Sequence, residues 1–77
     1  MTSEPDPNTI FVRLLDEGVE VWRPVSVERL GDGVYRILDQ PYDPSVETWE
    51  FEPGELVVCR IVELEGGQMM GADRLAS

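Results

Sequence analysis

ETWEFEPGELVVCRIVEL, residues 47–64, is the stretch that decides the fold of this chain. In its first part Trp49 and Phe51 alternate with glutamates, which is the period of a half-buried strand. After a Pro-Gly turn signal, seven of the nine residues in 56–64 are apolar. A strand that is apolar on both faces is typically covered on both faces, so we expect residues 56–64 at the centre of a small β core.

The length of 77 residues allows one small domain with a limited core. Residues 1–8 hold two prolines, two acidic residues and no aliphatic residue after Met1, which is typical of a disordered leader. Residues 9–77 are then the folded domain. With one cysteine and no histidine, neither an internal disulfide nor a Cys/His zinc site is expected, and we predict no cofactor.

Sixteen acidic residues stand against six arginines and no lysine, which gives a formal net charge of −10. Such a chain repels nucleic-acid phosphates and anionic membranes unless its arginines cluster, and they are spread along the sequence. No apolar run approaches the roughly 20 residues of a membrane span. The first eight residues also lack the basic and apolar regions of a signal peptide. We therefore expect a cytoplasmic protein that binds neither nucleic acid nor membrane.

Residues 10–15 and 19–30 predict two strands ahead of the central stretch, and the second alternates along most of its length. Four valines share its odd positions and should face the core: Val19, Val21, Val25 and Val27. Trp22 has the opposite parity and should face away from the core. Pro24 cannot donate a hydrogen bond to a neighbouring strand, so we expect an edge or a bulge there.

Two glycine-containing turns set the expected pairing of the remaining strands. Residues 31–33, Gly-Asp-Gly, predict a three-residue loop with its second glycine in the left-handed region. This loop pairs Leu30 with Val34 and places Glu28 opposite Arg36, on the outer face.

Residues 66–67, Gly-Gly, suit a type I′ turn that pairs Leu64 with Met69 and Ile61 with Ala72. Six short strands, close turns and no helical period indicate an all-β fold. The expected architecture is a single small barrel or sandwich of five to six short antiparallel strands.

Residues 51–58, FEPGELVV, resemble the diverging-turn segment of SH3-like barrels. Residues 67–72, GQMMGA, are similar to the strand where those domains carry a tryptophan pair followed by a small residue, and Tudor-type and KOW-type modules share the Pro-Gly-acid-aliphatic pattern. The resemblance implies a small SH3-like β-barrel. Binding of proline-rich peptides does not carry over, because the first strand has no tyrosine and Met69 replaces the first tryptophan. RNA binding does not carry over either, because the loops are acidic.

The sequence offers no pair of groups typical of catalysis. Its serines have no histidine or lysine partner to act as a base. Cys59 lies in an apolar strand, where a thiol is usually an inert small hydrophobe. Glu50 and Glu52 alternate with aromatic residues and are expected on a solvated strand face, and Asp39 and Asp43 lack the spacing of a calcium loop. We therefore predict that the protein is not an enzyme.

An exposed Trp22 on an acidic surface has the composition of a protein-binding hot spot. The alternative is that a bulge near Pro24 changes the register and buries the indole. The irregular loop 39–45, DQPYDPS, should extend the same surface. The candidate protein-binding residues are Trp22, Pro24, Tyr42, Asp39 and Asp43.

These residues favour a non-catalytic interaction module that binds an unidentified partner protein or a second copy of the chain. The alternative is a small acidic inhibitor, an immunity protein or nucleic-acid mimic, that blocks a basic site on its target. Ionic strength distinguishes the two, because association of the inhibitor should slow steeply with added salt.

Overall fold

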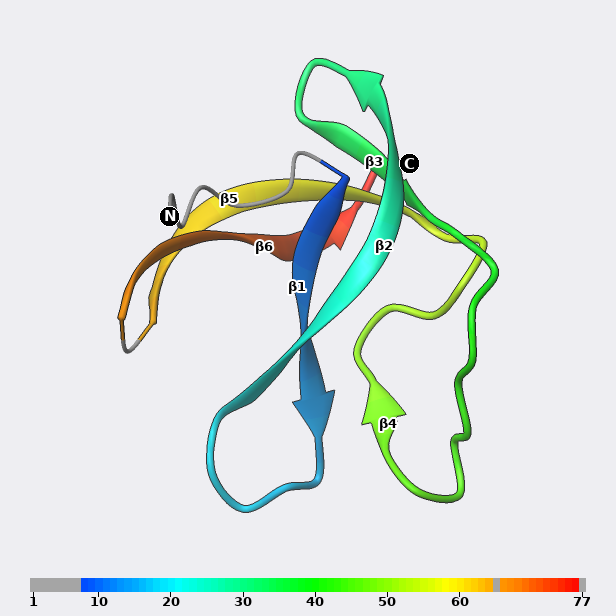
Figure 1. The fold of residues 1–77 in the computed structure, drawn as a ribbon, viewed down its shortest axis with the longest axis vertical. Helices are drawn as coiled ribbons and strands as arrows, with labels where there is room; N and C mark the ends of the chain where they lie inside the picture. Colours follow the sequence, from blue (N-terminus) through cyan, green and yellow to red (C-terminus); the bar gives the residue numbers. More distant parts are fainter. Residues whose placement is uncertain (1–7, 65, 77) are drawn as a thin grey trace, which may run out of the picture.

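The computed structural model describes residues 8–64 and 66–76. Six strands form one mixed sheet, and the described residues contain no helix (Figure 1). The strands are β1 (Thr9–Leu15), β2 (Val21–Gly31), β3 (Val34–Ile37), β4 (Thr48–Trp49), β5 (Leu56–Leu64) and β6 (Gly67–Leu75). The all-β prediction is therefore confirmed. Within this part of the chain there is also no helix that could cross a membrane.

The predicted leader lies outside the described residues except for Asn8. The carbonyl of Asn8 accepts a hydrogen bond from the Val27 amide at 2.8 Å, so this residue already belongs to the folded part.

The long strand β2 pairs with two neighbours in turn, with β1 along its first half and with β3 along its second. The strand order is β2-β3-β5-β6-β1-β4, and β2 pairs with β1 as well (Figure 1). Pairing therefore runs from β1 through β2, β3, β5 and β6 and returns to β1. A circuit of five strands cannot alternate in direction throughout, and the β1–β6 pair is parallel. The prediction of a wholly antiparallel sheet is wrong at this pair.

The core is built from inward-facing aliphatic residues of β1, β2, β3, β5 and β6, together with three aromatic residues, Tyr35, Trp49 and Phe51. The members with the least exposed surface are Ile10, Val12, Val25, Val27, Ile37 and Val57. Trp49 and Phe51 are buried beside them, as the alternation predicted.

Two expectations about the core are wrong. Val19 precedes β2 and is 74% exposed, because positive φ angles at Asp16 (61°) and Gly18 (76°) turn the chain before the strand begins. β5 lies between β3 and β6, as expected, but Leu56 and Ile61 are 41% and 61% exposed. The strand is therefore not covered on both faces.

In the hairpin between β2 and β3, the predicted pairing of Glu28 with Arg36 is present, but the turn differs from the predicted one. Glu28 lies opposite Arg36 with an ion pair of 2.7 Å on the outer face. However, Val34 pairs with Gly31 and not with Leu30, and the register shifts between Arg29 and Gly31. A two-residue turn with positive φ at both positions, 54° and 77°, is thus combined with a bulge in the strand.

Replacing Gly33 by alanine should lower the free energy of unfolding by about 1 kcal/mol or more, because alanine resists a φ of 77°. Apart from the adjoining residues, no heavy atom lies within 4 Å of the position that the new Cβ would take, so the loss reflects backbone strain alone. Denaturation with urea measures the loss. D-Alanine introduced at the same position by chemical synthesis should keep the stability, since it favours positive φ; an equal loss for both isomers would contradict the explanation.

The β5–β6 hairpin is displaced from the predicted register by two residues. Leu64 pairs with Gly67, and Ile61 pairs with Met70. A shift of two residues leaves each side chain on its expected face, because strand faces alternate with a period of two.

Candidate functional site

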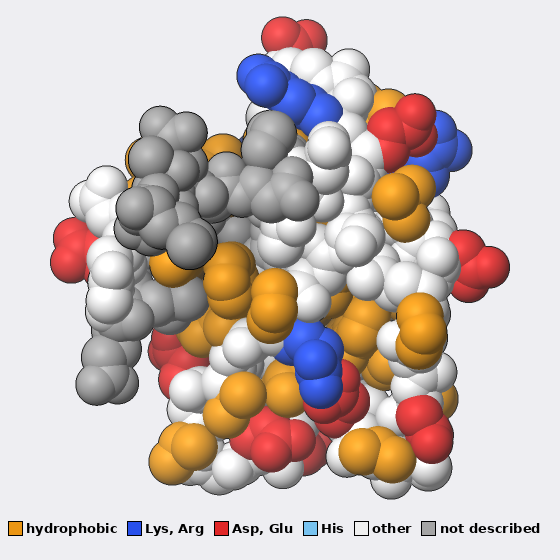
Figure 2. Space-filling model, viewed as in Figure 1, with side chains coloured by type: hydrophobic (Ala, Val, Ile, Leu, Met, Phe, Trp, Pro, Cys, Tyr) orange, Lys and Arg blue, Asp and Glu red, His pale blue; other side chains and the backbone are white. Residues whose placement is uncertain are grey.

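An open pocket of about 400 Å³ lies between β2 and the loop that leads to β4, and we call it the β2–loop groove. Arg23 and Pro24 of β2 form one wall, and Pro41, Tyr42 and Val46 are among the residues of the other. On the face shown in Figure 2, hydrophobic side chains gather in the lower half of the view, interspersed with acidic ones. The groove is therefore mixed in character, with an apolar lining beside carboxylates.

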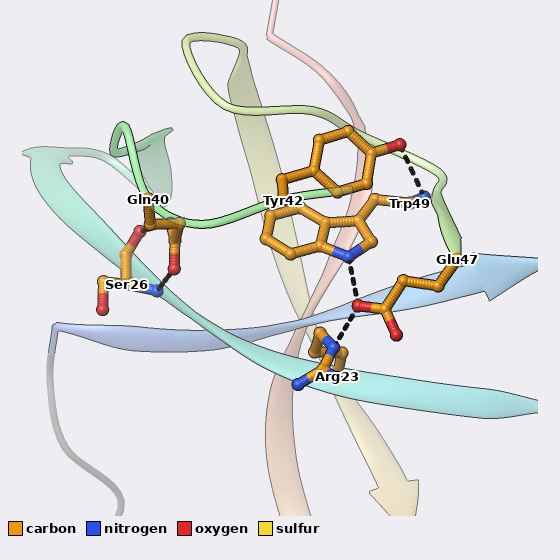
Figure 3. A network of polar contacts seen from close by, with 6 residues as sticks. All are labelled: Arg23, Ser26, Gln40, Tyr42, Glu47 and Trp49. Carbon is orange, nitrogen blue, oxygen red and sulfur yellow. Dashed lines mark hydrogen bonds and ion pairs between the residues drawn. The ribbon is translucent and has the colours of Figure 1, made fainter. Parts of the chain in front are cut away.

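Tyr42 is held in the groove by contacts with the core. Its ring centroid lies 4.4 Å from that of Trp49, with the planes tilted by 34° (Figure 3). The Tyr42 hydroxyl accepts a hydrogen bond from the Trp49 amide at 3.2 Å and donates one to Glu52 at 3.3 Å. Since Trp49 is only 4% exposed, Tyr42 is the aromatic ring that the groove presents.

Glu47 ties the loop to β2. Its carboxylate accepts a hydrogen bond from the Trp49 indole at 2.8 Å and forms an ion pair with Arg23 (Figure 3). These contacts, the indole hydrogen bond above all, lower the pKa of Glu47 below its ordinary value of 4.5. The Arg23–Glu47 pair therefore joins the two walls of the groove.

The start of the loop is attached to β2 through Gln40. Its side-chain oxygen accepts a hydrogen bond from the Ser26 amide at 2.9 Å, and its nitrogen donates to the Ser26 carbonyl at 2.9 Å (Figure 3). The same nitrogen donates to the Leu38 carbonyl at 2.8 Å. The amide group thus continues the strand pairing of β2 beyond the end of β3 and satisfies backbone groups there.

Asp43 and Val46 lie at a tight turn of the loop. The Asp43 carbonyl accepts hydrogen bonds from the Val46 and Glu47 amides, at 3.0 and 3.1 Å. Its carboxylate accepts two more from Ser45, from the hydroxyl at 2.6 Å and the amide at 3.0 Å, which lower the pKa of Asp43. The turn therefore presents an ionised carboxylate next to the side chain of Val46, which is 75% exposed.

The structure brings three of the five sequence-predicted site residues together, since Pro24, Tyr42 and Asp43 all line the groove. Pro24 pairs with Phe11 of β1 without a register shift, at a point of β2 that β3 does not reach. The edge predicted for the proline is thus present, and the bulge is not. Asp39 lies elsewhere, in a separate shallow pocket beside Arg36.

Trp22 faces away from the core, as its parity predicted, because it pairs with Arg13 in an unbroken register. It is nevertheless half-buried. A Cβ atom at Gly71 would lie 3.0 Å from Cζ3 of the indole and 3.0 Å from Val62, so the ring lies over β6. Its Nε1 donates to Glu20 at 2.9 Å. Trp22 does not line the groove, and the structure does not join it with Tyr42 in one surface.

Six of the residues that line the groove were not among the predicted site residues: Arg23, Gln40, Pro41, Val46, Glu47 and Trp49. The sequence does contain an indication for Arg23, because its parity is that of the valines expected to face the core, although its side chain is 48% exposed in the structure. A charged residue at such a position needs a partner, and here the partner is Glu47. Gln40 and Glu47 lie in or next to an irregular loop, where no periodicity marks them.

The groove contains groups suited to recognition. It offers an aromatic ring, prolines, an exposed valine and carboxylates whose pKa values are lowered. Outside it, burial and then the charge of Asp73 raise the pKa of the half-buried Cys59 thiol to about 11, which makes it a poor nucleophile. Among the described residues, no group of three or more Asp, Glu, Cys or His side chains could hold a metal ion.

Acid should weaken the attachment of the loop through Glu47. Because the folded-state pKa lies below 4.5, the contacts contribute fully above that pH, and the contribution is lost as the pH falls through the lower value. Glu47→Gln removes the titrating group. The stability difference between wild type and this variant should be constant near neutral pH and should shrink below pH 4.5, as measured by urea denaturation across a pH series. A difference that stays constant into strong acid would contradict this.

Comparison of the chain with protein-family models, curated proteins and solved structures gives no match.

Proposed function

We propose that this chain is a non-catalytic interaction module with an SH3-like barrel fold, which binds a partner protein in the β2–loop groove. The return of the strand pairing from β6 to β1 supports a closed sheet of this kind. The groove is the observation that carries the function, because it combines a fixed aromatic ring with an exposed aliphatic residue and a charge.

The groove is built in advance of binding. The hydrogen bonds of Gln40, Tyr42 and Glu47 attach the loop at its start, middle and end. A binding surface that is already ordered loses less conformational entropy when a partner docks. Aromatic anchors in well-packed surroundings are typical of protein-binding hot spots, and Tyr42 has this environment.

The charge of the chain indicates the chemistry of the partner. Among the described residues, four of the six arginines form ion pairs with acidic side chains: Arg23, Arg36, Arg60 and Arg74. Among the described residues, the Asp43 carboxylate forms no ion pair with an arginine, and it lies beside Val46. With a net charge of −10, the chain attracts a basic segment and repels an acidic one. The partner segment therefore carries an apolar side chain next to an arginine or lysine.

Val46→Glu should abolish capture of the partner from cells that produce the protein, because it places a charge at the apolar part of the groove. Val19→Glu is the matched control, since Val19 is exposed to the same degree, 74% against 75%, and lies outside the groove. Both variants change the net charge equally. Asp43→Asn should weaken binding and reduce its dependence on salt.

Two results would contradict the proposal. Capture of the same partner by Val46→Glu and wild type would exclude the groove. A steep salt dependence that is unaffected by Val46→Glu and by Asp43→Asn would instead favour an acidic inhibitor that acts through its overall charge.

A further inference from the structure

The strand β2 has two backbone edges, and β3 covers only the second half of one of them. β3 pairs with this edge from Val27 onwards, while β1 pairs with the opposite edge. The first half of the edge that β3 leaves open, at residues 22–24, has no strand beside it within the described part of the chain. It borders the β2–loop groove, because Arg23 and Pro24 line that pocket.

Two hydrogen bonds show which backbone groups point to this edge. The Val27 amide donates on the β1 side, whereas the Ser26 carbonyl accepts from Leu38 on the β3 side. Since neighbouring residues of a strand direct their backbone groups to opposite edges, Pro24 and Trp22 share the direction of Ser26. Although the Trp22 side chain lies outside the groove, its amide and the carbonyls of Trp22 and Pro24 therefore point to the open edge. These three groups have no hydrogen-bond partner among the described residues.

The residues outside the described part of the chain are attached to it away from this segment. Asn8 lies on the opposite edge of β2, next to Val27, and β1 runs antiparallel to β2. The chain before Asn8 therefore enters the fold beyond Val27 and not beside residues 22–24. Residues 65 and 77 adjoin β5 and β6, which are not neighbours of β2.

At the next position along this edge, a side chain already takes the place of a strand. The Gln40 carboxamide accepts a hydrogen bond from the Ser26 amide and donates one to the Ser26 carbonyl, both at 2.9 Å (Figure 3). These are the hydrogen bonds that the backbone of a neighbouring strand would make. Amide groups on the groove side can thus pair with β2, and Gln40 makes no such bond with Pro24 or Trp22.

We propose that the partner segment binds in an extended conformation and adds a short strand to β2 along residues 22–24. This inference rests on the function proposed for the groove and specifies the form of the ligand. In strand addition, backbone hydrogen bonds contribute affinity and alternate side chains contribute specificity. The carbonyls of Trp22 and Pro24 accept hydrogen bonds from the segment, and the Trp22 amide donates one. Because Pro24 lacks an amide, the edge does not suit a long strand, and the added one is short.

The side chains of the added strand alternate in step with those of β2. Arg23 points to the loop, where it pairs with Glu47, and Trp22 points to the other face. Every second side chain of the segment therefore faces the loop, next to the exposed Val46 and the Asp43 carboxylate. The apolar residue and the arginine or lysine of the segment are thus two positions apart. The net charge of −10 favours the basic residue.

Two synthetic peptides test this arrangement by nuclear magnetic resonance titration of the full chain at low ionic strength. In the capped peptide Thr-Thr-Arg-Thr-Val-Thr-Thr the arginine and the valine are two positions apart, and in its control, Thr-Thr-Arg-Val-Thr-Thr-Thr, they are adjacent. Both have the same composition and the same tendency to be extended. We expect the alternating peptide to bind about tenfold more tightly than the control.

Hydrogen exchange at the Trp22 amide reports the added strand directly. With the alternating peptide at about ten times its dissociation constant, exchange there should slow by about tenfold, because only the free chain exchanges. The Val25 amide, which β1 already pairs, should change little. Methylation of single peptide nitrogens should weaken binding by about tenfold at alternate positions only, since alternate amides of an added strand face β2.

Val46→Glu separates failure of this inference from failure of the function proposed for the groove. It should abolish binding of the alternating peptide, and Val19→Glu should not. If binding depends on Val46 but Trp22 exchange is unchanged, or methylation has no alternating effect, strand addition is wrong and the groove remains the site. Binding that Val46→Glu leaves intact would exclude the groove itself. No binding of the alternating peptide at millimolar concentration would overturn the ligand chemistry stated here.

Discussion

Trp49→Ala is expected to lower the free energy of unfolding by about 3–5 kcal/mol, which is most of what so small a domain has. Trp49 is 4% exposed, contacts the ring of Tyr42 and donates its indole hydrogen to Glu47. Its removal leaves a cavity in the core and detaches the loop that forms one wall of the groove. Urea denaturation followed by circular dichroism measures the loss.

Trp22→Ala is the matched control, because it removes the same kind of side chain from a half-buried position on β2, on the face that points away from the core. The sequence alone predicts almost no change in stability for this variant. With the indole lying over Gly71, we expect a measurable loss that is clearly smaller than the loss for Trp49→Ala. Equal losses at the two tryptophans would contradict the assignment of Trp49 to the core and Trp22 to its outside.

Gly71→Ala is expected to lower the free energy of unfolding by about 1–3 kcal/mol through overpacking. The added Cβ would lie 3.0 Å from both Trp22 Cζ3 and Val62 Cγ2, which is closer than side chains tolerate without moving. Thermal or urea denaturation of the variant measures this loss.

A double-mutant cycle separates crowding from other causes. In a Trp22→Ala background the space above Gly71 is vacated, so Gly71→Ala should cost much less there. Gly33→Ala, where the loss is backbone strain, should cost the same in both backgrounds. If the cost of Gly71→Ala were also the same in both, the contact between β2 and β6 would not be its cause.

The strands and the inward-facing side chains of the fold could be predicted from the sequence. Alternation located β2 and identified Val25, Val27 and Trp49 as core residues. The turns were harder. Asp32-Gly33 is a dipeptide typical of a two-residue type I′ turn, but the alternation of the flanking strands favoured a three-residue loop, because the sequence does not indicate the bulge between Arg29 and Gly31. At Asp16 no local pattern indicates the positive φ.

The candidate site could be predicted only in part, because its geometry depends on contacts between distant residues. Pro24, Tyr42 and Asp43 were identified from composition, as a proline in a strand and an irregular loop. The partner of Arg23 could not be identified from composition, because Glu47 is distant in the sequence and only the fold brings it close to Arg23. The partial burial of Trp22 against β6 depends on the parallel pairing of β1 with β6, and these two strands come from opposite ends of the chain.

Photo-crosslinking in intact cells tests the binding role of the β2–loop groove most directly. A photoreactive phenylalanine analogue placed at Val46 is predicted to form a covalent adduct with one partner protein, because this position projects from the groove wall. The same analogue at Val19, equally exposed but outside the groove, should form no adduct with that partner. An adduct formed equally at both positions, or at Val19 alone, would contradict the account.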